Sequence, residues 1–151
     1  MRIVKLLILI FIGQVAYSQL SLDSLKEVWY DVSLPNTDRF EAMAKILEHG
    51  RIISYYDSCE YYSDLEIAEA KSLGLDKYLA HGLYFRSNTY LATSQIPQAI
   101  ATIDSALHIY SELNDVYGIS ICKAIKGTIE LYYNQNDYVT RKNRKHFPGF
   151  L

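Results

Sequence analysis

Apolar residues recur at intervals of three and four over most of the chain, and short polar breaks divide them into segments. The clearest segment carries seven such positions: Ala99, Ile100, Ile103, Ala106, Leu107, Tyr110 and Leu113. This spacing places them on one face of a helix. Pro97, just before the stripe, suits a first helical turn because its φ is fixed and its missing N–H is not needed there. The pattern predicts a helix over residues 97–113.

The same spacing predicts four other helices, each with its own boundary signals. Asp38 and Glu41 have the spacing of a capping box, and Gly74 is typical of a left-handed helix stop. The expected helices cover about 38–54, 57–73, 76–93 and 116–134. Residues 19–36 are expected to form a lead-in segment before them.

Positions of similar character recur along the chain with a nearly constant period. The pairs are Cys59 and Ala99, Leu73 and Leu113, Leu83 and Ile125, and Tyr90 and Tyr132. Equal helix–turn–helix units with a period of about 40 residues are typical of stacked repeats. The sequence therefore predicts an all-α helical-hairpin repeat solenoid of about two and a half repeats over residues 37–138.

Residues 1–18 have the pattern of an export signal. Arg2 and Lys5 precede a short apolar run at 6–12, and small residues stand before a cleavage site after Ser18. The run is shorter than the roughly 20 residues of a membrane span. We expect a cleaved signal peptide and an exported protein, periplasmic or secreted. An uncleaved anchor is the alternative, and it would be the chain's only membrane contact.

Charge is distributed unevenly along the rest of the chain. Residues 19–140 contain nine basic and 17 acidic residues, which argues against a nucleic-acid partner. Residues 139–151 contain four basic residues and no acidic one, and we expect them to be irregular. They form either a basic docking tail or the end of a fragment of a longer protein. We favour the fragment, because Ile125, Ile129 and Tyr132 would otherwise lack the next helix of the stack.

Candidate chemistry is sparse. Cys59 and Cys122 each lie on an apolar helical stripe, which favours two buried free thiols, although export would permit a disulfide. No histidine lies at metal-ligand spacing from another histidine or from a cysteine; the four are His49, His81, His108 and His146. No nucleophile, metal or phosphate-loop motif is present. We expect no enzymatic activity and no cofactor.

The repeat pattern resembles the tetratricopeptide repeat (TPR) family. The matching, repeat-defining residues are Leu83, Tyr90, Ala99, Ala106, Ile125 and Tyr132. The chain departs from the family where a Leu-Gly pair is usual, at Arg86-Ser87 and Thr128-Ile129, and it has Glu66 where Ala is preferred. Residues 34–138 are also similar to the exported N-terminal TPR region of Bacteroidetes-type sensor histidine kinases and helix-turn-helix regulators.

The resemblance implies that the first helix of each pair lines a concave groove that binds a protein or peptide partner. The residues it places there are His81, Tyr84, Asn88, Leu91, Lys123, Lys126, Glu130 and Tyr133. It further implies a protein–protein interaction module that forms the sensory or scaffold input part of a bacterial signalling protein. The alternative is a self-standing periplasmic scaffold with a basic docking tail. The identity of the partner and the oligomeric state remain open.

Overall fold

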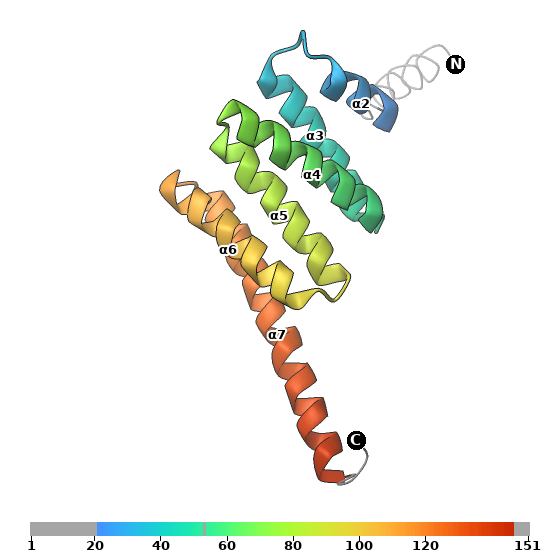
Figure 1. Cartoon of the computed structure of the whole chain (residues 1–151), viewed down its shortest axis with the longest axis vertical. Coiled ribbons are helices and arrows are strands. Elements are labelled where there is room, and N and C mark those ends of the chain that lie inside the picture. The colour runs from blue at the N-terminus through green and yellow to red at the C-terminus, as the bar shows by residue number, and fades with distance from the viewer. Residues whose placement is uncertain (1–20, 53, 147–151) are drawn as a thin grey trace, which may run out of the picture. The chain divides into compact units, whose positions relative to one another are not determined.

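The computed structural model describes residues 21–52 and 54–146, and the side chains among them up to residue 131. Six helices and no strands make up the described residues, so the expected all-α class is confirmed (Figure 1). The expected signal peptide, residues 1–18, lies outside them. In the described part, no helix is both long and apolar enough to span a membrane.

The chain divides into two units, one ending at Glu48 and one beginning at His49. The first unit contains α2 (Leu22–Tyr30) and most of α3 (Asn36–Ile52), whose last turn belongs to the second unit. The expected lead-in segment therefore contains a helix of its own.

Local contacts explain why α2 forms and how it is fixed to α3. The hydroxyl of Ser21 accepts a hydrogen bond from the backbone N–H of Ser24 at 3.2 Å, which caps the helix start. Trp29 is buried and meets Phe40 edge to face, with ring centroids 5.3 Å apart. Arg39 donates a hydrogen bond from Nε to the carbonyl oxygen of Trp29 at 3.0 Å. This buried charged side chain therefore has a hydrogen-bond acceptor between α2 and α3.

The second unit contains α4 (Tyr56–Leu73), α5 (Asp76–Ala92), α6 (Ile96–Glu112) and α7 (Val116–His146). The predicted helices up to α6 are confirmed, with both ends of each within two residues of the expected bounds. Each helix of this unit packs against the next, and α5 also contacts α7 (Figure 1). Helices α5 and α7 are therefore neighbours, although α6 lies between them in the sequence.

The turns from α3 to α7 share one backbone geometry and are evenly spaced along the chain. Each contains one residue with positive φ: Ser54 at 57°, Gly74 at 65°, Ser94 at 61° and Asn114 at 55°. In every case the N–H of the following residue donates to the carbonyl five positions earlier, at 2.7 to 3.0 Å. This is the 6→1 bond of a Schellman ending, which satisfies a terminal helix carbonyl. Each helix with its turn therefore occupies the same length of chain.

Helices α4 and α6 bury corresponding positions. The buried residues of α4 are Cys59, Ser63, Glu66 and Ala70, and those of α6 are Ala99, Ile103, Ala106 and Tyr110. Taken in order, each residue of the first set and its counterpart in the second are separated by the same length of chain, from Cys59 with Ala99 to Ala70 with Tyr110. The two helices thus present the same face to their neighbours.

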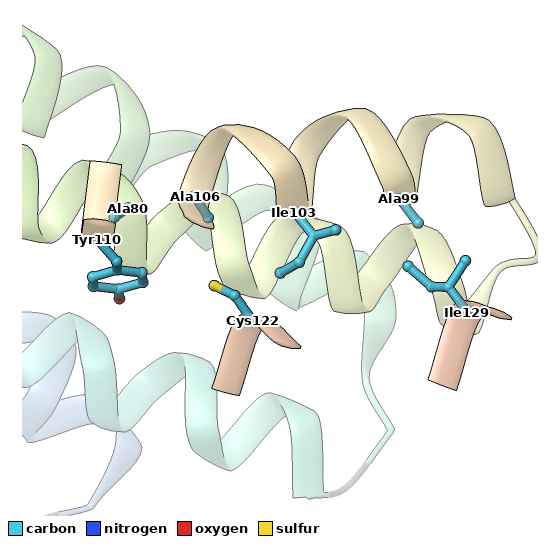
Figure 2. Close-up of a cluster of buried hydrophobic side chains, with 7 residues drawn as sticks. All are labelled: Ala80, Ala99, Ile103, Ala106, Tyr110, Cys122 and Ile129. Carbon is cyan, nitrogen blue, oxygen red and sulfur yellow. The ribbon is translucent and has the colours of Figure 1, made fainter. Parts of the chain in front are cut away.

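The apolar core of the second unit lies between α5, α6 and α7 (Figure 2). Its buried members are Ala80, Ala99, Ile103, Ala106, Tyr110, Cys122 and Ile129. Ala99 and Ala106 have no exposed surface, so small residues were correctly expected at the helix contact. Three more of the repeat-defining residues pack partly buried against this core: Leu83, Tyr90 and Ile125. The side chain of Tyr132 lies outside the described part.

The last helix is longer than predicted. It was expected to end near residue 134 and to be followed by an irregular tail from 139, but α7 continues to His146. The polar run at 134–137 contains neither Gly nor Pro, and the first residue that cannot continue a helix is Pro148. The prediction of an irregular tail is therefore wrong for residues 139–146.

Both cysteines are buried free thiols, as predicted. Burial in the apolar core raises the pKa of the Cys122 thiol to about 11. This cysteine therefore acts as a small apolar residue of the core.

Candidate functional site

A cleft with a volume of about 540 Å³ opens in the second unit beside the C-terminal half of α5. The end of α3, the start of α4, the α5–α6 turn and the middle of α7 complete its walls. Its apolar lining consists of Cys59, Phe85, Leu91, Ala92 and Ile96, and its polar lining of Arg51, Tyr56, Asn88, Thr89, Ser94 and Thr128. The volume lies within the range of roughly 300–1,000 Å³ that is usual for ligand sites.

Hydrogen bonds inside the helices use part of the polar capacity of this lining. Asn88 donates one amide hydrogen to the carbonyl of Tyr84 at 2.9 Å. Thr128 donates its hydroxyl hydrogen to the carbonyl of Ala124 at 3.1 Å. An amide carries two N–H groups and one oxygen, and a hydroxyl keeps its lone pairs after donating. The cleft can therefore offer both donors and acceptors to a ligand.

Four groove residues were expected from α5, and two of them line the cleft. Asn88 and Leu91 are among its walls, whereas Tyr84 and His81 are not among the described lining residues. Tyr84 instead packs edge to face on Phe85, with ring centroids 5.1 Å apart. Through this contact Tyr84 supports the ring of Phe85, which lines the cleft.

His81 pairs with a buried carboxylate. Its Nδ1 lies 3.0 and 2.9 Å from the two carboxylate oxygens of Glu66, whose side chain has no exposed surface. Burial raises the pKa of Glu66, and the hydrogen bond and charge of His81 act in the opposite direction. Gly82 gives this acid room, because a Cβ there would lie 3.3 Å from Oε2 of Glu66. The side chain of Glu66 is thus accommodated by a glycine on the next helix.

The expected groove residues of α7 are not part of the described cleft lining. Lys126 forms an ion pair with Asp104 of α6, and Lys123 and Glu130 are exposed. Tyr133 has its side chain outside the described part. From this helix, only Thr128 contributes to the described lining. Among the side chains that the structure describes, two of the expected residues, Asn88 and Leu91, therefore lie together in the cleft lining.

Arg86 holds the two helices that flank this region together. Its guanidinium lies 3.0 Å from carboxylate oxygens of both Glu60 and Asp64 on α4, and 4.8 Å from the ring centroid of Tyr90. Only 14% of its side chain is exposed. The cationic side chain of Arg86 thus links α4 to α5.

Sequence reasoning missed Arg51, Tyr56 and Phe85 as cleft residues. Phe85, Asn88 and Ala92 lie at helical spacing on α5, which is a signal that could have extended the expected set. Arg51 and Tyr56 come from two different helix ends, and nothing in their local sequence marks them. Only the tertiary arrangement brings them beside α5.

No cluster of three or more potential metal-binding His, Cys, Asp or Glu side chains occurs among the residues that the structure describes. The chain matches no family model, no curated protein and no solved structure.

Proposed function

We propose that this chain is an exported helical-hairpin repeat module of the tetratricopeptide type, and that its function is to bind a protein or peptide partner. In this proposal α3 and α4 form the first pair, α5 and α6 the second, and α7 is the first helix of a third. The module acts as the sensory or scaffold input part of a bacterial signalling protein.

The observation that carries the proposal is the regular backbone of the second unit. Turns of one geometry recur at even spacing, and α4 and α6 bury corresponding positions. Each pair is too thin to bury both of its faces alone, so equal pairs are stable when stacked. The contact between α5 and α7 is what stacking of successive first helices requires.

The position of the cleft supports binding as the function. Side chains from α3, α5 and α7, the three first helices of the proposed pairs, line it together with the start of α4. Stacked repeats use the surface along their helices for extended partners. A mixed polar and apolar lining also suits a polypeptide, which has amide groups and side chains to match it.

One observation favours the alternative of a self-standing scaffold with a basic docking segment. Residues 139–146 continue α7 as a helix, and the four basic residues of the tail belong to this stretch. A helical basic segment suits docking to an acidic surface. Removing residues 139–151 would separate the two candidates, since only the alternative predicts that partner binding is lost.

Paired tryptophan variants test the proposed function. Ala92→Trp places an indole at the cleft, and Ala101→Trp places one on exposed α6 as the matched control. Each variant, and the wild-type chain, is used to capture proteins from the cell envelope of the source organism. The proposal expects a partner that wild type and Ala101→Trp retain and Ala92→Trp loses. An identical set of captured proteins for all three chains would contradict it.

A further inference from the structure

Helix α7 has large apolar side chains on the side that does not face the core of the second unit. Its buried residues, Gly118, Cys122 and Ile129, share one side of the helix. Tyr117 and Leu131 lie on the other side and are 76% and 67% exposed. Exposed apolar side chains that gather on one face mark an interaction surface.

The positions between these two side chains have the spacing of a helix contact. The outer face of α7 consists of Tyr117, Ser120, Ala124, Gly127 and Leu131, at alternating intervals of three and four residues. This is the spacing of the contact positions in a pair of packed helices. A Cβ on Gly127 would have nothing within 4 Å, so another helix has room to approach its backbone.

Two exposed residues of opposite charge flank the outer face on one side. Lys123 and Glu130 are separated by one heptad and therefore lie along the same edge of the face. A two-fold axis forms every contact between two copies twice, in reciprocal pairs. If Ala124 of one copy lies opposite Gly127 of an antiparallel second copy, Lys123 of each copy lies within about 3 Å of the level of Glu130 of the other. Two equivalent ion pairs then form.

The same charges disfavour the neighbouring arrangements. Sliding the second copy by one heptad brings either Lys123 or Glu130 level with its own counterpart, and like charges repel. In a parallel pair, Lys123 would face Thr128 of the second copy and gain no opposite charge. The outer face of α7 is therefore complementary to itself in one antiparallel register. The partner that it fits is a second copy of this chain.

We propose that α7 is a dimerisation helix, and that two copies of the chain pair through its outer face in an antiparallel arrangement about a two-fold axis. Ala124 and Gly127 lie at the axis, and Lys123 of each copy pairs with Glu130 of the other. No residue of the outer face belongs to the described lining of the cleft, so the dimer holds two clefts. A partner with two matching segments would then bind through both of them.

Sedimentation equilibrium of the full chain over a range of concentrations tests the association. We expect a reversible equilibrium between monomer and dimer. Lys123→Glu should weaken the dimer about tenfold, because two ion pairs change from attraction to repulsion. Lys123→Glu combined with Glu130→Lys in the same chain should restore it. Lys77→Glu, at an exposed position of α5, is the matched control and should change nothing. Circular dichroism checks that each variant keeps the helix content of the wild type.

Cysteine crosslinking tests the antiparallel register. The proposed register brings Ser120 of one copy opposite Leu131 of the other. A mixture of Ser120→Cys chains and Leu131→Cys chains, distinguished by a tag, should therefore form a disulfide between the two different chains. Either variant alone should crosslink little, because its two identical positions lie roughly 16 Å apart along the helix axis. Ala101→Cys on exposed α6, mixed with Leu131→Cys, is the control and should give no such product.

Three results would overturn the inference. A chain that stays monomeric at every concentration would leave the outer face of α7 to another segment or to a different protein. A dimer that Lys123→Glu leaves unchanged would form through another surface, such as the apolar run at 6–12. Crosslinks that form as readily within each variant as between the two would refute the antiparallel register. The proposed function is judged separately, by the capture of partner proteins with the cleft variant Ala92→Trp.

Discussion

Two glycines in first helices of the proposed pairs provide a sharp test of the packing. Gly82 of α5 is buried against α4, and a Cβ added to it would lie 2.8 Å from Cγ1 of Ile67 and 3.3 Å from the backbone nitrogen of the same residue. Gly127 of α7 has nothing within 4 Å of the corresponding position. The same substitution, glycine to alanine, should therefore have opposite effects at the two sites.

The magnitudes follow from two terms. Alanine in a helix interior is more favourable than glycine by up to about 1 kcal/mol, and this gain applies at both positions. At Gly82 the new methyl group also overpacks the contact, at a cost of about 1–3 kcal/mol, because a β-branched Ile67 and a backbone atom cannot move aside easily. We expect Gly127→Ala to raise the free energy of unfolding by about 0.5–1 kcal/mol. Gly82→Ala should lower it by up to about 2 kcal/mol.

Urea denaturation followed by circular dichroism measures both variants against the wild-type chain. The informative quantity is the difference in free energy of unfolding between the two variants, because the helix propensity of alanine relative to glycine contributes equally to both. If Gly82→Ala stabilised the chain as much as Gly127→Ala does, the close approach of α4 and α5 would be refuted.

Three further predictions concern buried side chains of the second unit. Ala106→Leu should lower the free energy of unfolding by about 1–3 kcal/mol through overpacking. Ala101→Leu, on the exposed side of α6, should change it little. Equal urea midpoints for the two variants would refute the assignment of the buried face. Cys122, with its thiol pKa raised to about 11, should be ionised in only about one molecule in a thousand at pH 8. It should react with a disulfide reagent far more slowly in the native chain than in urea, and similar rates would contradict its burial. Burial raises the pKa of Glu66 above its ordinary 4.5, so ionisation costs the folded state stability as the pH rises above that value. The free energy of unfolding of Glu66→Gln, minus that of the wild type, should therefore increase between pH 4.5 and pH 7.5. A difference that stays constant or decreases over this range would be inconsistent with a net penalty for burying the carboxylate.

Helix positions could be predicted because apolar spacing and end signals agreed. The stripe that contains Ala99 and Ala106 was visible in the sequence, and both residues are fully buried where the contact requires small side chains. Gly74 marked one turn correctly, since glycine adopts positive φ without strain. Ser54 and Ser94 adopt the same conformation, yet serine carries no such signal, and the regular turn spacing became visible only in the backbone.

The end of α7 was missed for a related reason. A polar run resembles a loop in composition, but residues such as Asn and Gln lower helix propensity only modestly and do not break a helix. The composition of residues 134–137 therefore predicted a helix end at a place where α7 continues.

The candidate site was predictable only in part. Asn88 and Leu91, two of the residues expected on α5, both line the cleft. His81 was expected on the same surface, but a buried acid on α4 pairs with it. Which partner a side chain meets depends on the neighbouring helix, and helical spacing within one segment contains no information about it.

Hydrogen–deuterium exchange on the full chain, with and without a captured partner, tests the central claim most directly. If the chain is a repeat module that binds through its first helices, the partner should slow exchange in the C-terminal half of α5, around residues 85–92, and near Thr128 of α7. Exchange in α6, residues 96–112, should remain almost unchanged. Protection confined to α6, or no protection at the cleft, would contradict the account.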